Sequence, residues 1–252
     1  MTLRSLAIVD RMQGRFDQAH ARLVESLPVL REVGDLSSQA HVLNNLAQVA
    51  LERRETEAAL ELALESVAVS ERIGRGGERN LAQSVHRLAH VHLALGNRVR
   101  AAVAFRKVIG IVRAQSDWVG LAHATFGLAQ TQLAAGEVDA AFEGMTEALR
   151  TARQSGSPLL EGQIVLTMAQ IESRRGNRDR AETWLAGART LFVQTGSLPW
   201  LQRSAEMSTL WRGADADIGP GQGRGHEAAG LDVAGDRPAI GVTRRRPVPR
   251  RV

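Results

Sequence analysis

Three histidines come closest, by residue type and spacing, to forming a reactive centre in this chain. His86 and His90 are four residues apart, so a helix would present both imidazoles on one face. With His123 from a neighbouring helix, they would supply three nitrogen ligands, enough for a zinc ion. Arg87 would repel a cation at this place, however, and no acidic residue shares the face. The sequence therefore predicts neither a metal ion nor any other cofactor.

Other motifs that carry chemistry are incomplete. The segment HEAAG at His226 begins like the zinc-protease pattern HExxH, but Gly230 stands where the second histidine would be. No Gly-Lys pair exists, so a P-loop is excluded, and GPGQGRG from Gly219 lacks the dinucleotide-binding spacing. Without cysteine there is no thiol nucleophile and no disulfide. We therefore expect a protein that is not an enzyme.

Composition and charge exclude further classes of protein. Hydrophobic residues make up 44% of the 252 residues, yet no apolar run reaches the roughly 18 residues of a membrane span. No secretory signal is evident at the start, so we expect a cytoplasmic protein without a membrane partner. The net charge is +5, and the segment from Arg212 onward, with eight arginines and five acids, contributes 8 − 5 = +3 of it. The charge pattern therefore does not predict nucleic acid as a partner of this chain alone.

The main organising feature is a unit that occurs five times. A Leu-Ala or Met-Ala pair recurs at steps of 40, 42, 40 and 40 residues, beginning at Leu6, Leu46, Leu88, Leu128 and Met168. Three further markers keep the same register. They are a turn residue (Gly14, Arg54, Gly96, Gly136, Gly176), a small residue five positions later (Ala19, Ala59, Ala101, Ala141, Ala181), and a second break (Gly34, Gly74, Ser116, Gly156, Gly196). Such a fixed period indicates a repeat architecture.

Each unit has the pattern of two helices. In the second copy Leu43, Leu46, Ala47 and Ala50 have the i, i+3, i+4, i+7 spacing of one helical face. Glycine after the first helix predicts a left-handed terminating residue. Asp or Ser after the second break, at Asp35, Asp117, Ser157 and Ser197, predicts an N-cap for the helix that follows. Arg54 replaces the turn glycine in the second copy, and residues 75–77 make that copy two residues longer. We expect a looser loop there.

These residues resemble the tetratricopeptide repeat, stretched from the usual ~34 residues to ~40. The form LNNLA in the second copy is similar to the longer repeats of kinesin light chain and to the sensor regions of large bacterial transcription regulators. The resemblance implies an all-α, right-handed solenoid of five helical hairpins plus a C-terminal capping helix. We expect repeats at about 1–34, 35–75, 76–116, 117–156 and 157–196, and a capping helix at 198–212. Together they make a repeat domain at 1–212.

A polar face recurs on the first helix of each unit, about 200° from the apolar stripe. By the resemblance, this face lines a concave groove that binds a protein or peptide. The residues predicted to line the groove are His41, Asn44, Asn45, Gln48, His86, Arg87, His90, His123, Phe126, Gln130 and Gln170. Asparagine and glutamine amides complement the main chain of an extended peptide. We expect a ligand carboxylate near the basic cluster at 86–90 and an apolar ligand side chain near Phe126.

Other residues receive structural interpretations. Gln83, Gln163 and Thr167 are expected to be solvated surface. His92 should lie near the seam between two helices, and the tryptophans at 118, 184, 200 and 211 should pack rather than bind a ligand.

The two ends carry their own hypotheses. Residues 213–252 are rich in Gly, Pro and Arg and predict a disordered tail. The first helix lacks its opening turn and cap, so we expect an upstream domain or a second copy to cover Ile8 and Met12. The favoured function is the sensor or interaction region of a bacterial transcriptional regulator. A free-standing adaptor or peptide-signal receptor is the alternative, and a nucleic-acid binder acting through the tail is a third hypothesis.

Overall fold

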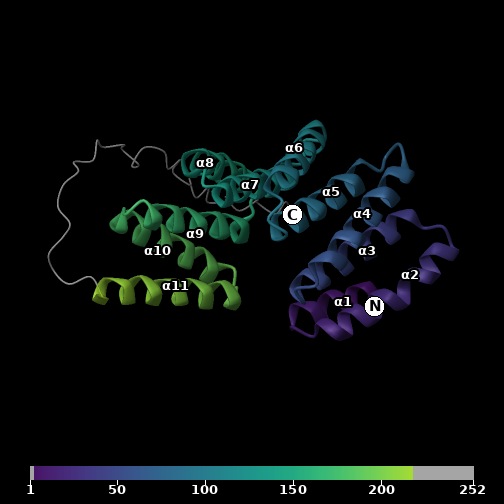
Figure 1. Cartoon of the computed structure of the whole chain (residues 1–252), viewed down its shortest axis with the longest axis horizontal. Helices are drawn as coiled ribbons and strands as arrows, with labels where there is room; N and C mark the ends of the chain where they lie inside the picture. Colours follow the sequence, from purple (N-terminus) through teal and green to yellow (C-terminus); the bar gives the residue numbers. More distant parts are fainter. Residues whose placement is uncertain (1–2, 218–252) are drawn as a thin grey trace, which may run out of the picture. The chain divides into compact units, whose positions relative to one another are not determined.

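The computed structural model describes the backbone of residues 3–217 and the side chains of residues 3–211. Within this part of the chain there are eleven helices joined by short turns (Figure 1). Their bounds are α1 Leu3–Met12, α2 Phe16–Glu32, α3 Leu36–Glu52, α4 Thr56–Ile73, α5 Glu78–Ala94, α6 Arg98–Ala114, α7 Trp118–Ala135, α8 Val138–Gln154, α9 Pro158–Arg174, α10 Arg178–Gln194 and α11 Leu198–Asp217.

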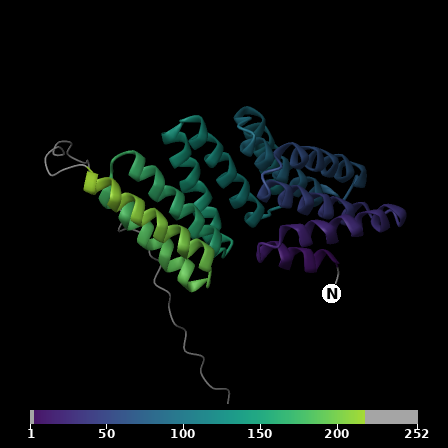
Figure 2. The same ribbon diagram turned by 60° about the horizontal axis from the view of Figure 1, so that its bottom comes forward.

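The helices pack in consecutive pairs, α1 with α2 through α9 with α10, and each second helix also packs against the first helix of the next pair (Figure 2). The helix α11 closes the series, since Trp200, Leu201 and Trp211 pack on the core of the last pairs. The all-α solenoid of five hairpins with a terminal helix is therefore confirmed. The helix α11 continues to Asp217, five residues beyond the predicted end, and the rest of the predicted tail lies outside the described residues.

Left-handed residues end the helices as expected. Glycines 14, 34, 96, 156, 176 and 196 all have φ between 64° and 78°. Arg54, with φ of 64°, and Ser116, with φ of 54°, adopt the same conformation without being glycine, which costs on the order of 1 kcal/mol each. The turn at Arg54 is thus as tight as the others. The extra length of the second repeat is taken up in α4, which has 18 residues, and in the loop of residues 74–77.

Two of the predicted N-caps, Asp35 and Asp117, are made by side chains. The Asp35 carboxylate accepts a hydrogen bond from the Ser38 backbone N–H at 2.9 Å, and Asp117 accepts one from Gly120 at 2.9 Å. The bonds from Ser38 lower the pKa of Asp35 below its usual value. The prediction was wrong for Ser157, whose side chain makes no capping bond. Pro158 occupies the first helical position there, where a missing N–H costs nothing.

The apolar core is divided unequally along the stack. One continuous cluster joins α7 to α11 and holds Met145, Ile164 and Phe192, each with 0% exposure. The helices before α7 contribute to three smaller clusters. One of these, formed mainly by α5 and α6, also includes Leu121 and Ala124 of α7. No helix in residues 3–217 is long and apolar enough to cross a membrane.

The tryptophan predictions are only partly right. Trp184, Trp200 and Trp211 are partly buried against the largest cluster, and the Trp200 ring stacks on Phe192 at 5.8 Å between centroids. Trp118 is 52% exposed at the start of α7, so it is not part of the apolar core.

Candidate functional site

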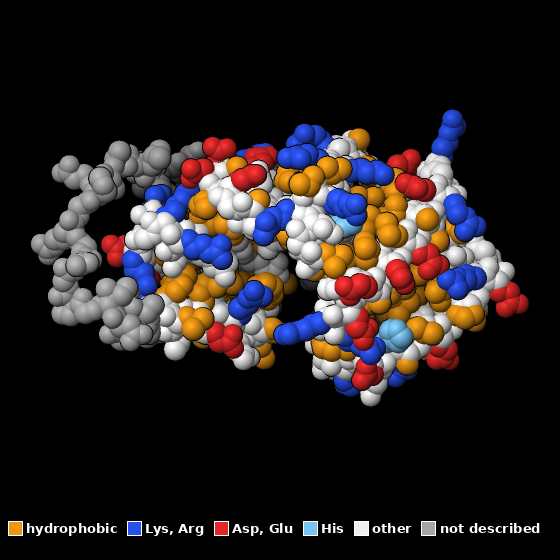
Figure 3. Space-filling view, viewed as in Figure 1, with side chains coloured by type: hydrophobic (Ala, Val, Ile, Leu, Met, Phe, Trp, Pro, Cys, Tyr) orange, Lys and Arg blue, Asp and Glu red, His pale blue; other side chains and the backbone are white. Residues whose placement is uncertain are grey.

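A groove of about 620 Å³ is lined by residues of α1, α3, α5 and α6 and of the N-terminal end of α7. It brings together six of the eleven predicted residues: His41, Asn44, Asn45, His86, Arg87 and His123. Gln83, predicted to be solvated surface, is exposed but also lines the groove. In the space-filling view, several basic side chains border the hollow at the centre of the face (Figure 3).

The two adjacent asparagines of α3 have different surroundings. Asn44 is 8% exposed, and its Nδ2 donates to the Ser84 hydroxyl of α5 at 3.1 Å, which ties the second repeat to the third. Ser84 also lies 2.8 Å from the hydroxyls of Ser66 and Ser70, so four polar side chains form one buried cluster. The Asn44 Oδ1 has no partner. Asn45 is half-buried and borders the groove.

A chain of polar contacts crosses three successive first helices beside the groove. Arg11 donates to Glu52 at 2.7 Å, and the Gln48 amide donates to the same carboxylate at 2.6 Å. The Arg87 guanidinium donates to Gln48 Oε1. Burial and then Arg11 lower the pKa of Arg87 to about 10, against the opposing effect of Glu52. The network therefore holds two cations against one carboxylate, and Arg87 Nε has no partner.

The predicted histidine cluster is present and packed on an aromatic ring. The centroids of His86 and His90 are 4.6 Å apart, those of His86 and His123 are 6.3 Å apart, and His86 meets Phe105 edge-on at 5.6 Å. Burial lowers the pKa of His90 to about 4 and that of His86 well below its usual value, so both imidazoles are neutral at pH 7. Among the described residues, no group of three His, Cys, Asp or Glu side chains is arranged to hold a metal ion.

Phe126 does not face the groove, contrary to the prediction. Its side chain is 9% exposed and belongs to the largest core cluster. The exposed apolar lining of the groove is instead Val119 from α7 at 45% exposure and Ile8 from α1 at 36%, whereas Val108 and Val112 of α6 lie beneath it at 2% and 3%. A Cβ on the neighbouring Gly127 would lie only 2.3 Å from the Phe105 ring, so α6 and α7 pack too closely there to leave a groove.

The remaining predicted residues lie elsewhere. Gln48 and His90 take part in the contacts beside the groove, and Gln130 is half-buried on α7. Gln170 lines a separate pocket of about 370 Å³ between α9 and α11. Thr167, predicted to be solvated surface, is 9% exposed and donates to the Gln163 carbonyl within its own helix.

Buried polar residues were the main omission from the sequence reasoning. Asp10, at 4% exposure, accepts hydrogen bonds from Arg15 and Arg22, which lower the pKa of its carboxyl. Glu172, at 0% exposure, accepts bonds from Arg175 and Asn177. Both acids follow the Leu-Ala or Met-Ala marker by four positions, on the apolar stripe, and this placement was the available signal. His92 at the same register position is 7% exposed, as expected of a seam residue.

Comparisons with known proteins agree with this geometry. Residues 1–72 match the family model of the tetratricopeptide repeat, and residues 54–130 and 121–161 match the model of anaphase-promoting complex subunit 5. Residues 1–72 are thus tetratricopeptide repeats, and the described helices that follow continue the same consecutive pairing. A search of curated protein sequences gave no match.

Solved structures share the tetratricopeptide-type fold. A putative kinesin light chain from Podosopora anserina is 19% identical, with a TM-score of 0.59, covering 77% of this chain and 94% of that one. The Rap conjugation gene regulator of plasmid pLS20, in complex with the Phr* peptide, is 11% identical, with a TM-score of 0.72, covering 81% and 56%. A STAND protein with a tetratricopeptide repeat sensor from Pyrococcus horikoshii is 17% identical, with a TM-score of 0.65, covering 80% and 31%. The chain thus spans just over half of the Rap regulator and about a third of the STAND protein.

Proposed function

We propose that this chain binds an extended segment of a protein or peptide in the groove between α3, α5 and α7, without catalysing a reaction. The observation that carries the proposal is a set of buried polar atoms without partners at the groove. Asn44 Oδ1, His86 Nε2 and Arg87 Nε all belong to lining residues. Buried polar groups are normally paired, so unpaired ones on residues that line an open cavity favour a ligand whose binding turns these side chains toward it.

The charge of the groove favours a ligand carboxylate. The network of Arg11, Glu52 and Arg87 carries one surplus positive charge, and Arg4 and Arg79 add two exposed cations to the lining. Guanidinium groups bind carboxylates through paired, charge-assisted hydrogen bonds. We therefore expect the ligand to present a carboxylate beside α5, as the cluster of basic residues had indicated.

The apolar contact belongs at a different place from the one that the sequence suggested. Because Phe126 is buried and Val112 is only 3% exposed, Val119 offers the available apolar surface at the α6–α7 end of the groove. The ligand segment should thus carry an apolar side chain a few residues from its carboxylate, with main-chain hydrogen bonds to Asn45 in between.

Peptide arrays test this function. Wild-type chain should bind a subset of acidic peptides, and the double variant Asn45→Ala with His86→Ala should lose that binding. Arg79→Gln should weaken binding of acidic peptides by about tenfold, as expected when a charge-assisted pair is removed. The control Arg106→Gln alters an exposed arginine of α6 away from the groove, and Thr167→Ser alters a buried side chain. Both controls should bind like the wild type, and equal binding by the double variant would refute the groove.

The biological role that we favour is the sensor region of a larger bacterial transcriptional regulator. The similarity to the tetratricopeptide repeat sensor of a STAND protein supports it. A free-standing adaptor or peptide-signal receptor is the second candidate, supported by the similarity to a Rap regulator solved with the Phr* peptide. An immunoblot of a native lysate distinguishes them. A band well above 27.3 kDa favours the regulator, and a band at 27.3 kDa favours the receptor.

The arginine-rich tail offers a separate test of nucleic-acid binding. Binding through the tail would weaken steeply with salt and be lost on deletion of residues 213–252. Binding of a peptide in the groove should survive this deletion, because all the groove residues precede position 213.

A further inference from the structure

The second helix of each repeat exposes one stripe of five residues, which we call the outer stripe. These residues follow the Leu-Ala or Met-Ala marker by 11, 15, 18, 22 and 25 positions, which is the spacing of one helical face. They are exposed in all five repeats. The outer stripe of α4 consists of Glu57, Glu61, Leu64, Ala68 and Glu71, and that of α6 of Val99, Val103, Arg106, Gly110 and Arg113.

The charge of the outer stripe changes sign between α4 and α6. The stripe of α4 holds three glutamates and no cation, whereas that of α6 holds two arginines and no acid. In α2 and α8 the stripe has equal numbers of acids and arginines, and in α10 it has a single acid. The whole of α6 contains no acid and five cations, which are Arg98, Arg100, Arg106, Lys107 and Arg113. An acidic face and a basic face thus belong to successive repeats.

The residues of the basic face are not those that best stabilise its helix. In the other four second helices the second position is an acid, which favours the positive end of the helix dipole. These acids are Asp17, Glu57, Asp139 and Asp179. The same position in α6 is Val99, between Arg98 and Arg100. Gly110 is also unfavourable within a helix, although a Cβ at this position would meet nothing within 4 Å. Neither residue is required by the fold, so both favour a role at the surface.

The opposite charges of the two faces are mostly unpaired within the chain. Lys107 Nζ lies 3.7 Å from the Glu71 carboxylate, so a side chain of α6 reaches α4. Glu57 and Glu61 nevertheless form no ion pair among the described residues, and neither do the four arginines of α6. Their charges remain available to a second molecule.

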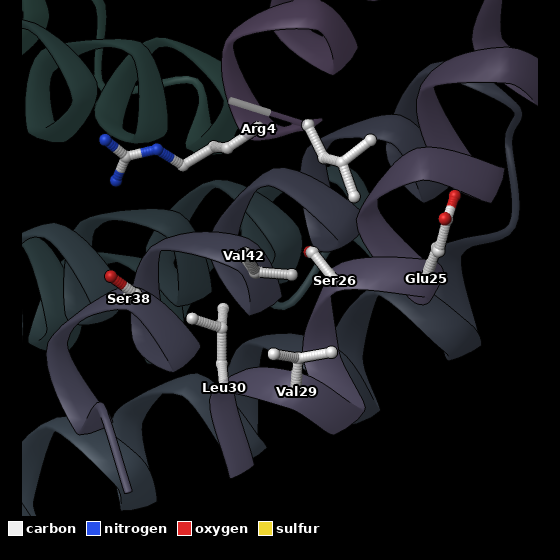
Figure 4. A pocket seen from close by; sticks show the side chains of 8 residues that line it. Arg4, Glu25, Ser26, Val29, Leu30, Ser38 and Val42 are labelled. Carbon is white, nitrogen blue, oxygen red and sulfur yellow. The ribbon is translucent and has the colours of Figure 1, made fainter. Parts of the chain in front are cut away.

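Both faces also expose apolar side chains. Leu64 of α4 is 49% exposed, and Val99 and Val103 of α6 are 79% and 60% exposed. Val29 of α2 differs from them, because it lines a pocket of about 360 Å³ together with Leu30 (Figure 4). Leu64, Val99 and Val103 line none of the pockets described above. A surface with an apolar centre, charged residues around it and no pocket suits contact between two helix faces.

We propose that the outer stripes of α4 and α6 form a self-complementary surface through which two copies of this chain associate. These two helices run in the same direction, since they are equivalent elements of successive repeats. A two-fold axis parallel to them and midway between them places α4 of each copy on α6 of the other, acid against base. Equal register positions then lie at the same height, so Glu61 is within one turn of Arg106 of the second copy. No residue of either stripe lines the groove of the proposed function.

The acids on both sides of α6 favour a second copy over nucleic acid. The acids of α4 lie on one side. On the other side is Glu147 of α8, whose pKa is lowered by its bond to Arg150 and, to a smaller extent, by the charge of Arg113. A phosphate backbone crossing α6 would be repelled by these acids, and the outer stripe of α6 offers no aromatic ring for bases to stack on. A second copy instead presents acids over α6 and cations over α4.

The first test is sedimentation velocity of the full chain. At low ionic strength it should show a dimer that dissociates as salt is added, because salt screens exposed charges. The α4-reversed chain carries Glu57→Arg with Glu61→Arg, and the α6-reversed chain carries Arg106→Glu with Arg113→Glu. Each should raise the dissociation constant by about tenfold or more, because like charges then face each other. The matched control Glu143→Arg changes an exposed acid in the balanced stripe of α8 and should leave the dimer intact. A monomeric wild-type chain, or reversed chains that dimerise as the wild type does, would overturn the proposal.

An equimolar mixture of the two reversed chains is the sharper test. In the mixed dimer one pair of helices has both charges reversed and the other pair is unchanged, so both pairs again hold opposite charges. The mixture should therefore associate as tightly as the wild type, which two misfolded variants would not do. A mixture that stays monomeric would overturn the proposal. So would a DNA duplex that binds a monomeric wild-type chain but not the α6-reversed chain, because the basic face would then belong to nucleic acid.

Discussion

The first helices of the second and third repeats differ from those of the fourth and fifth at the same register positions. Two positions before the Leu-Ala or Met-Ala marker, the chain has Asn44 and His86 in the earlier pair, and Phe126 and Leu166 in the later pair. One position before the marker it has Asn45 and Arg87, and then Gly127 and Thr167. The four residues of the second and third repeats line the groove. In the fourth and fifth repeats, Phe126, Leu166 and Thr167 are each at most 9% exposed, and Gly127 has no side chain.

The same repeat backbone therefore carries two kinds of helix face, one apolar and one polar. In α7 and α9 the face is filled by apolar residues that join a single cluster extending to α11. In α3 and α5 the neighbouring helices are joined by polar contacts, through Ser84 and through Gln48 with Arg87. The later repeats therefore form a continuous apolar core, and the earlier ones are joined by polar side chains at and beside the groove.

The largest expected difference between the two regions is in stability. Phe126→Ala should lower the free energy of unfolding by about 3 to 5 kcal/mol, because it leaves a cavity in the largest cluster. His86→Ala, at the same register position, should cost no more than about 2 kcal/mol while reducing ligand binding. Urea denaturation of both variants measures this contrast. Equal losses would mean that the two regions are packed alike.

Acid should destabilise the earlier repeats selectively. The pKa of His90 falls from 6.5 to about 4 on folding, because burial disfavours the imidazolium. Between these values the unfolded chain binds a proton that the folded chain does not, so stability declines as the pH falls from 6.5 toward 4. His90 alone accounts for about 3 kcal/mol of this loss.

The variant His90→Gln checks that assignment. Its urea midpoint should fall less between pH 7 and pH 4.5 than the wild-type midpoint does. Hydrogen exchange should show protection lost first in α5, since the described residues after His123 contain no histidine. An unchanged acid response in the variant would contradict the prediction.

A smaller effect is expected at the serine cluster. Ser84→Ala removes the hydroxyl that Asn44, Ser66 and Ser70 share, and it leaves the Asn44 Nδ2 without a partner in a buried place. We expect a loss of about 1 to 2 kcal/mol in the free energy of unfolding. Ser37→Ala is the control, since Ser37 is exposed and should change stability by less than about 0.5 kcal/mol. Similar values for the two variants would show that the cluster contributes nothing.

The smallest effect concerns Trp118, which sequence reasoning had assigned to packing. With 52% of its surface exposed, Trp118→Ala should alter the free energy of unfolding by less than about 0.5 kcal/mol. Thermal unfolding beside the wild type measures it. A loss above about 1 kcal/mol would restore the packing assignment.

The repeat plan could be predicted because it depends on local chemistry. The turn glycines require a left-handed backbone, and Asp35 and Asp117 cap the helices that follow them, so boundaries are visible in the sequence itself. The apolar stripe at 43, 46, 47 and 50 is buried as its spacing indicated. Six of the predicted residues also meet at one groove, because equivalent positions of successive helices lie side by side: His41, Asn44, Asn45, His86, Arg87 and His123.

How deeply each side chain is buried within the stack of helices could not be predicted in this way. A helical period gives the direction of a side chain but not the distance to the next helix, so Asn44 and Asn45 looked alike until one was found bonded to Ser84. Phe126 was assigned to the groove for the same reason, although close packing at Gly127 buries that face. Asp10 stands on an apolar stripe, and only the three-dimensional arrangement reveals the arginines that compensate its charge.

The four-residue loop between α4 and α5 has a practical consequence for protein engineering. It takes up one of the two extra residues of the second repeat, α4 takes up the other, and the Leu-Ala marker then resumes at Leu88. Arg75 and Gly76 are exposed at its tip. A fluorescent reporter inserted between them would extend into solvent, so this junction is a permissive site for labelling the protein without altering any residue that lines the groove.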